Sequence, residues 1–305
     1  MSSAISPKKT LTMVLFLVLV WGINWPLTKM ALPHTPPVLF SGIRTLIGGM
    51  ILLPIALRRS GALRWKQNAG AYLLVALLNV IGYYGLQTVG IGYLPAGLFS
   101  TLVFLQPILL GIFSRIWLGE ELNRLKVAGL ILGFAGVAVI SLGGLEGHLS
   151  PFGIGLALLS ALCWALGTIY MKKQGARLDS VWTVTMQLLI GGAALLLLGS
   201  GTEHWRDIEW NTEFILILLF ISIFVIAGGW MIYFLLIEAG EVSTVGAYTF
   251  LIPVLSNLFS IVLLGESATI TLLIGLLMIA GSIMFVNRRK PPASKLAALP
   301  NRSKH

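Results

Sequence analysis

Residues 104–120 read FLQPILLGIFSRIWLGE, and residues 250–266 read FLIPVLSNLFSIVLLGE. The two stretches lie 146 residues apart and share a Phe-Leu pair, a proline, a Phe-Ser pair and a closing Leu-Gly-Glu at matching positions. A second register, offset by 143 residues, places Trp21 on Trp164 and Ile47-Gly48-Gly49 on Ile190-Gly191-Gly192. Agreement in both registers indicates that the chain contains two copies of one unit.

The composition identifies the chain as a membrane protein. It is 57% hydrophobic and only 10% charged, with a mean hydropathy of +0.91, whereas about one-quarter of the residues in a soluble domain are charged. Apolar windows long enough to cross a bilayer as helices occur at 11–30, 36–57, 70–92, 96–118, 124–142, 151–171, 180–200, 213–237, 243–264 and 268–286. The predicted fold is therefore an all-α integral membrane protein with ten transmembrane helices.

The basic residues set the predicted orientation. The net charge is +10. A cytoplasmic N-terminus places nearly all Lys and Arg inside, at 8–9, 58–66, 115–126, 172–177 and 288–304, and leaves Arg206 in an outer loop. This distribution follows the positive-inside rule. The positive charge is thus explained by the orientation of the chain in the lipid bilayer, with both termini cytoplasmic. We expect no nucleic-acid partner.

Five helices in each copy is an odd number, so the second copy must enter the membrane from the opposite side. We predict a first repeat at 11–142, an inverted second repeat at 151–286 and a basic cytoplasmic tail at 287–305. Inverted repeats of this kind are typical of secondary transporters that expose a midplane site to alternate sides.

The order of these motifs resembles a known family. Each half has a proline in its fourth helix, then Leu-Gly-Glu, then a Gly-rich last helix that includes Gly129-Leu130 or Gly275-Leu276. This order is similar to the ten-helix EamA-type carriers of the drug/metabolite transporter superfamily. The resemblance implies a carrier of small organic molecules in the bacterial inner membrane, often an exporter of amino acids or other metabolites. It also implies that helices 5 and 10 are peripheral, where a homodimer could form.

Aromatic residues inside the predicted spans are the first candidates for a substrate site. Trp21, Trp164, Trp230 and Tyr248 lie well within their spans. Aromatic side chains that line a cavity can bind an apolar or planar solute by stacking, or a cationic solute by cation–π contact. Core packing is the competing interpretation of the same residues.

Polar residues supply the other candidates. Asn79, Tyr83 and Gln87 follow one another at spacings of four, which places them on one face of an α-helix. Lipid cannot satisfy such groups, so the face must meet protein or a cavity. Asn24 belongs to the same set and precedes Pro26, which has no counterpart in helix 6.

Arg44 is the least expected residue. It lies about 10 Å from the outer end of helix 2, counting 1.5 Å per residue from Pro37. A charge at this depth is costly and is a functional candidate by default. The guanidinium of Arg44 has three possible roles: it binds a substrate carboxylate, it extends to the outer membrane surface, or it donates hydrogen bonds to helix carbonyls.

Pro107 and Pro253 occupy equivalent positions within helices 4 and 9. Proline inside a helix removes a backbone hydrogen bond and kinks it, so we expect two hinges. A static bend is the alternative. Glu120 and Glu266 lie near the membrane surface, where a structural role is expected.

The remaining residues narrow the function. No Asp or Glu lies near the centre of a span, which weakens proton exchange for lipophilic cations, and one buried Arg is too few for a nucleotide-sugar carrier. The histidines fall in loops or the tail and form no catalytic or metal motif: His34, His148, His204 and His305. We predict no catalytic residues, metal or cofactor, and a neutral or zwitterionic small-molecule substrate such as an amino acid. A channel, a transport-like sensor and a multidrug exporter remain alternatives.

Overall fold

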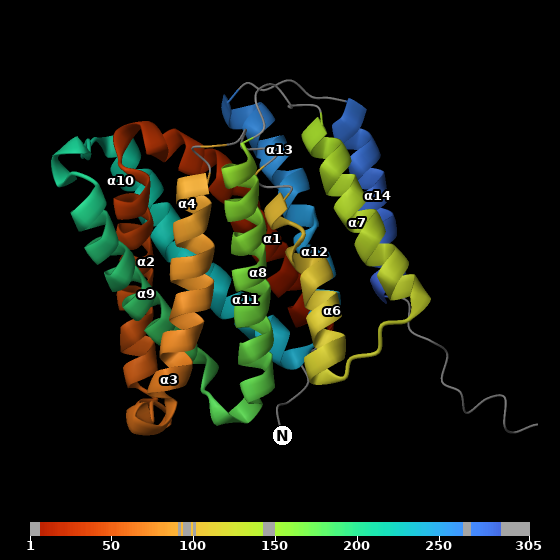
Figure 1. Cartoon of the computed structure of the whole chain (residues 1–305), viewed down its shortest axis with the longest axis horizontal. Helices are drawn as coiled ribbons and strands as arrows, with labels where there is room; N and C mark the ends of the chain where they lie inside the picture. The colour runs from red at the N-terminus through yellow and green to blue at the C-terminus, as the bar shows by residue number, and fades with distance from the viewer. Residues whose placement is uncertain are drawn as a thin grey trace, which may run out of the picture.

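The computed structural model describes residues 7–90, 93, 99, 102–142, 150–264 and 270–287. This part of the chain is helical and contains no strand (Figure 1). Seven segments are long and apolar enough to cross a membrane: 8–34, 37–57, 65–90, 151–174, 180–202, 212–239 and 242–263. Residues 106–118 and 273–287 form shorter apolar helices. The chain is therefore a multi-pass helical membrane protein.

The first half contains α1 (Pro7–Ala31), α2 (Pro37–Leu57), α3 (Trp65–Ala76), η3 (Leu77–Gly85), α4 (Leu86–Gly90), α6 (Gln106–Leu118) and α7 (Arg124–Leu142). The second contains α8 (Pro151–Gln174), α9 (Ser180–Thr202), α10 (Thr212–Phe220), η6 (Ile221–Gly229), α11 (Trp230–Ala239), α12 (Val242–Thr249), α13 (Leu251–Leu264) and α14 (Ile270–Asn287). Single 3₁₀ turns, at Leu32–His34, Ser60–Ala62, Gly175–Arg177 and Trp205–Asp207, lie in the connections.

Successive helices run in alternating directions (Figure 1). The start of α1, the end of α14 and the connections at 58–64, 119–123 and 175–179 all lie at the lower end of Figure 1. We call this end the basic end, because Arg58, Arg59, Arg64 and Arg177 lie in these connections. The first three of these residues belong to the first half of the chain and Arg177 belongs to the second, so basic residues of both halves lie at this end.

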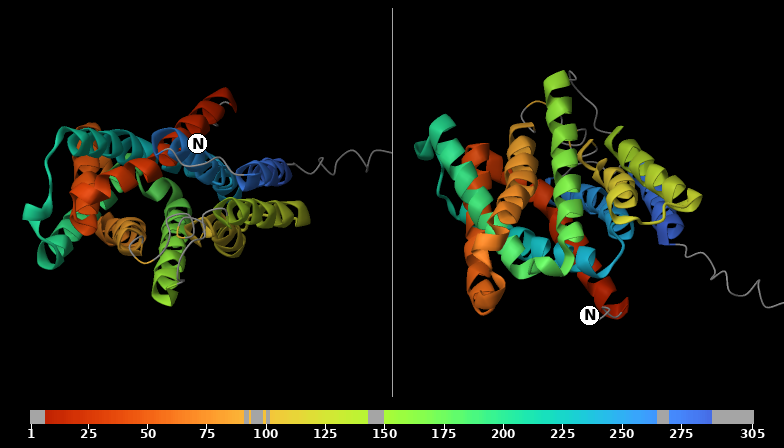
Figure 2. Two further views of the ribbon diagram at one scale, coloured as in Figure 1. Left: turned by 90° about the horizontal axis from the view of Figure 1, so that it is seen from above. Right: turned by 60° about the horizontal axis from the view of Figure 1, so that its bottom comes forward.

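The helix contacts are symmetric between the halves. α1 packs on α13 and η6, and its equivalent α8 packs on α6 and η3, which are the corresponding segments of the first half. The most extensive pairs join equivalent helices, α2 with α9 and α7 with α14. The second pair stands at one edge of the bundle (Figures 1 and 2).

Close approach in the α2–α9 pair depends on small residues. A Cβ on Gly192 would lie 2.7 Å from the backbone nitrogen of Leu46, and one on Gly49 2.9 Å from that of Leu189. These glycines belong to the Ile-Gly-Gly motifs of the two repeats. Small residues let membrane helices pack backbone to backbone, so the repeated motif is explained by the contact between the halves.

Both third helices of the repeats contain a π-helical segment. η3 and η6 are nine residues long and occupy equivalent positions, followed at once by α4 and α11. π-Helical turns are wider than α-helical turns and occur often at functional sites. Asn79 and Tyr83 lie in η3 and Gln87 lies in α4, so the three candidates on this helix span the junction of the two segments, and all three are buried.

Both prolines follow a local interruption of the helical hydrogen bonds. α6 begins at Gln106, directly before Pro107, and α13 begins at Leu251, two residues before Pro253. Leu105 and Phe250, which directly precede these helices, keep right-handed helical dihedrals, and residues 242–263 form one membrane-length helix. A proline has no amide hydrogen to donate to the carbonyl four residues earlier, which accounts for the interruption.

Candidate functional site

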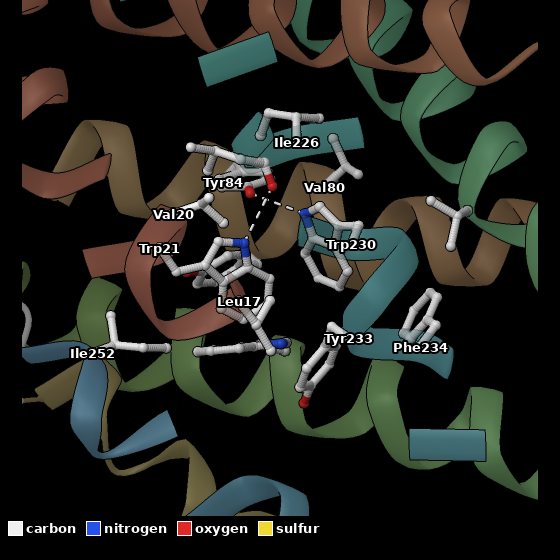
Figure 3. Close-up of a cluster of buried hydrophobic side chains, with 14 of the residues drawn as sticks. Leu17, Val20, Trp21, Val80, Tyr84, Ile226, Trp230, Tyr233, Phe234 and Ile252 are labelled. Atoms are coloured by element: carbon white, nitrogen blue, oxygen red, sulfur yellow. Dashed lines mark hydrogen bonds between the residues drawn. The ribbon is translucent and has the colours of Figure 1, made fainter. Parts of the chain in front are cut away.

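Aromatic side chains from four helices meet in the centre of the bundle. The aromatic cluster consists of Trp21 on α1, Tyr83 and Tyr84 on η3, Trp164 on α8, and Trp230 and Tyr233 on α11. Figure 3 shows Trp21, Tyr84, Trp230 and Tyr233 turned toward one another. The ring centroid of Trp21 lies 5.6 Å from that of Trp164 and 5.8 Å from that of Trp230. These spacings are favourable for edge-to-face aromatic contacts.

The cluster lies where the two repeats meet. Trp21 and Trp164 are equivalent positions of the repeats and touch each other. Tyr84 and Trp230 are also equivalent, in the 146-residue register, and the Trp230 Nε1 donates a hydrogen bond of 2.9 Å to the Tyr84 hydroxyl. Contacts between equivalent residues are expected at a pseudo-twofold axis.

A narrow cavity opens beside these rings. Its volume of about 20 Å³ accommodates roughly one water molecule and no organic solute. Trp21, Asn24, Tyr83, Phe104 and Trp164 contribute to its wall. The Trp164 Nε1 is buried without a hydrogen-bond partner, so an unused donor is available in the wall. The site is contracted in this conformation, and a solute would require the helices around it to separate.

Gly229, at the end of η6, allows Trp21 to enter the cluster. Trp21 Nε1 donates a hydrogen bond of 3.2 Å to the backbone carbonyl of Val225. A Cβ on Gly229 would overlap this Nε1 atom. The close approach of the indole to the η6 backbone therefore requires glycine at this position.

Gly229→Ala is expected to displace Trp21 and lower the melting temperature, because the indole cannot retain its bond to Val225. Gly155→Ala in α8 is the matched control, since nothing lies within 4 Å of the added Cβ. Thermal unfolding and tryptophan fluorescence measure both variants. If Gly229→Ala behaves like Gly155→Ala, the packing of Trp21 on η6 is not a constraint.

Arg44 lies beside the aromatic cluster. Its side chain is 1% exposed, and its guanidinium carbon lies 4.9 Å from the Tyr84 ring and 5.0 Å from the Phe40 ring. Nη1 donates a hydrogen bond of 3.4 Å to the Thr28 hydroxyl, and Nε has no partner. No carboxylate pairs with this guanidinium among the described residues. A buried cation without a counter-ion is costly unless an anion completes the site.

Two uncharged polar networks are buried in the bundle, and one of them includes Tyr233 of the cluster. Asn79 donates to Gln187 at 3.0 Å. Gln106 donates to the Tyr233 hydroxyl at 3.2 Å, and that hydroxyl also contacts Thr168 at 3.2 Å. The Asn79 Oδ1, Gln106 Oε1 and Gln187 Nε2 atoms are buried without partners. These networks leave hydrogen-bonding groups that a polar solute or water can use.

The structure brings most of the predicted residues together but separates two. Trp21, Asn24, Tyr83, Trp164 and Trp230 belong to the cluster or its cavity wall, Arg44 contacts the ring of Tyr84, and Asn79 is buried and bonded to Gln187. Gln87 is buried but does not line the cavity. Tyr248 also lies apart from the cluster, and its hydroxyl donates to Asn287 at the end of α14. The hinge role of Pro107 and Pro253 stays a prediction.

Several residues beside the cluster are not among the site residues that the sequence predicts. Thr28, Tyr84, Gln106 and Thr168 come close to candidates only in the folded chain, through the hydrogen bonds given above. Gln187 has a detectable signal: it aligns with Arg44 in the 143-residue register, so position 44 and its repeat equivalent are both polar and buried.

Hydrogen bonds join the end of α6 to the start of α12 at the basic end, and we call the contacts of Glu120 with Val242 and Ser243 the Glu120 latch. Glu120, which follows α6, accepts hydrogen bonds from the backbone nitrogens of Val242 and Ser243 at 2.6 and 3.2 Å and from the Ser243 hydroxyl at 2.7 Å. Lys126 of α7 forms an ion pair of 2.5 Å with Glu241. The first turn of α12 is therefore held by the end of the first repeat. Glu266, the repeat equivalent of Glu120, lies outside the described residues.

These features define a polytopic helical membrane protein with an aromatic cluster between two repeats. Among the described residues, no group of three His, Cys, Asp or Glu side chains could hold a metal ion. The model of the EamA-like transporter family matches residues 8–142 and 151–288, one match for each half. The chain belongs to the EamA-like transporter family. It is a transporter and not an enzyme.

Similar proteins agree with this assignment. The chain is 55% identical over 294 residues to the "Uncharacterized transporter YvbV" of Bacillus subtilis, covering 96% of each protein. It is 28% identical over 282 residues to a "Probable amino-acid metabolite efflux pump" of Salmonella typhimurium, covering 89% of this chain and 92% of the relative. A solved crystal structure matches with a TM-score of 0.79 and 21% identity, covering 92% and 97% of the two chains, which supports the fold.

Proposed function

We propose that the chain exports a small zwitterionic metabolite that carries an apolar or aromatic part, with an amino acid as the representative substrate. The observation that carries this proposal is Arg44, a buried guanidinium with one weak hydrogen bond and no described carboxylate partner. A substrate carboxylate would satisfy Arg44 through the planar fork of the guanidinium. The aromatic cluster beside it would contact the apolar part of the substrate.

The direction of transport rests on a separate argument. Two relatives, from Salmonella typhimurium and Escherichia coli, carry the name "Probable amino-acid metabolite efflux pump" at 28% and 27% identity. Efflux of an amino-acid-like solute from the cytoplasm fits both these names and the chemistry of Arg44. The bacterial inner membrane is the location in which such an exporter acts.

Transport would proceed by alternating access between two inverted five-helix repeats. The symmetric contacts of α1 with α13 and of α8 with α6 support two equivalent gates. The contracted cavity requires a second conformation in which the aromatic cluster opens. The Glu120 latch would seal the basic end in one conformation, and its release would open that end.

The basic end is proposed to be cytoplasmic and the protein to cross the membrane ten times. We expect a cysteine at Gly61 to react with an impermeant thiol reagent only from the cytoplasmic side. A cysteine at Gly201 should react only from outside, because Gly201 lies at the end of α9 that is distant from the basic end. Both glycines have nothing within 4 Å of an added Cβ, and Cys163→Ala removes the natural thiol. Reaction of both cysteines from the same side would contradict the topology.

Counterflow in proteoliposomes tests the proposed function. Vesicles loaded with unlabelled amino acids or their metabolites should accumulate the matching radiolabelled solute, whereas amides of the same solutes should exchange poorly. Single-channel conductance in place of counterflow would identify a channel. Binding without flux would identify a sensor, and exchange of lipophilic cations alone would identify a multidrug exporter.

A further inference from the structure

A groove separate from the aromatic cluster opens at the basic end. Its volume is about 560 Å³, and α2, α9, α11 and the two neighbouring connections contribute to its wall. The segments that form it are adjacent in Figures 1 and 2. None of its lining residues belongs to the cavity beside Trp21 and Trp164. The groove is therefore an independent feature of the fold.

One part of the groove wall is apolar and belongs to membrane-spanning helices. Ile55, near the end of α2, is 49% exposed. Met231 and Leu235, one turn apart on α11, are half-buried in the same wall. Ile55 belongs to the membrane-length segment 37–57, and Met231 and Leu235 belong to the segment 212–239, so all three lie on helices that are long enough to cross the acyl-chain region. A water-soluble anion would gain no binding free energy from contact with this apolar part of the wall.

The other part of the wall is basic. Arg59, Arg64 and Arg177 lie at the rim. Arg59 is paired with Asp179 at 3.3 Å. Arg64 and Arg177 have no acidic partner among the described residues. The remaining acidic group, Glu238, accepts a hydrogen bond of 2.7 Å from Ser180.

Arg64 has an unusual, left-handed backbone conformation. Arg64 has φ +42° and is the only non-glycine residue with positive φ in the described part of the chain. It directly precedes α3. A left-handed conformation is uncommon for a residue with a side chain and often accompanies a ligand site. Here it turns the chain between α2 and α3 at the rim of the groove.

We propose that this groove binds an anionic phospholipid of the cytoplasmic leaflet. An acyl chain would lie along Ile55, Met231 and Leu235, and the phosphate would lie between Arg64 and Arg177. Charge complementarity supports this occupant, because the two arginines without partners lie directly beyond the apolar wall. The lipid would bridge α2 of the first repeat and α11 of the second. The proposal rests on the cytoplasmic orientation of the basic end, and its test does not require transport.

Binding of phosphatidylglycerol to the purified protein in phosphatidylcholine nanodiscs, measured by native mass spectrometry, tests the site. Each basic residue near an anionic lipid contributes on the order of fivefold in affinity. The Arg64→Gln/Arg177→Gln variant should therefore bind about 25-fold more weakly. The matched control is Arg58→Gln/Lys173→Gln, which removes the same charge from exposed residues outside the groove. It should bind nearly as the parent does.

A third variant tests the apolar wall and keeps the proposal falsifiable if the arginine variant is unstable. Met231→Trp fills the groove and leaves its charges in place, so it should also weaken phosphatidylglycerol binding. Equal losses in the two charge variants would overturn the site and indicate a general attraction to the basic end. Competition by millimolar inorganic phosphate, with no effect of Met231→Trp, would identify a site for a free anion and overturn the lipid proposal.

Discussion

Arg44→Gln is expected to weaken binding of the substrate acid by about 10- to 100-fold, the range for loss of a hydrogen bond to a charged group, and to leave binding of the corresponding amide nearly unchanged. The reason is that the guanidinium would recognise the carboxylate and no other part of the solute. Isothermal titration or fluorescence binding of the acid and its amide to both proteins forms a double-mutant cycle. Coupling between Arg44 and the carboxylate would appear as unequal losses for the two ligands.

Two controls separate recognition from stability. Arg44→Lys keeps the charge but removes the planar fork, so it should restore only part of the affinity for the acid. Removal of a buried charge that has no carboxylate partner should not lower the melting temperature greatly, because the desolvation cost disappears with the charge. Equal losses for acid and amide, together with a lower melting temperature, would return Arg44 to a role in helix packing.

Glu120→Gln is expected to shift the protein toward a state that is open at the basic end, by about tenfold or more in population. The carboxylate accepts three hydrogen bonds from the first turn of α12. Caps of this kind contribute roughly 0.5–2 kcal/mol, and a charged acceptor strengthens the bonds further. The neutral amide has a single acceptor oxygen and cannot hold both backbone nitrogens equally.

Distances between spin labels at Arg115 and Ala239 measure this shift, because both residues are exposed at the basic end on the two sides of the latch. The labels are placed in the Cys163→Ala background. Glu121→Gln is the matched control, since Glu121 is exposed and the carboxylate bonds to Val242 and Ser243 given above come from Glu120. The latch hypothesis fails if Glu120→Gln and Glu121→Gln give the same distance distribution as the parent.

The central site shows why sequence spacing predicts only part of the result. Trp21 and Trp164 are recognisable as equivalent positions from the duplication alone, and the structure brings their rings into contact. Asn79, Tyr83 and Gln87 are grouped by helical spacing, but spacing does not show which neighbours each side chain meets. Asn79 donates a hydrogen bond to Gln187, and Gln87 lies outside the cavity wall. Local sequence rules carry no signal for the contact with Gln187, because that residue lies on another helix.

The membrane class, the two repeats and the resemblance to the family can be read from the sequence, because hydropathy and duplication are properties of the chain read in order. Arg44 is also visible there, since a charge inside an apolar span stands out without a structure. The contacts between side chains are a matter of tertiary structure. Tyr248 bonds to Asn287, Tyr84 pairs with Trp230, and Glu120 accepts hydrogen bonds from the start of α12. These contacts join residues from different helices, so no local pattern along the chain encodes them.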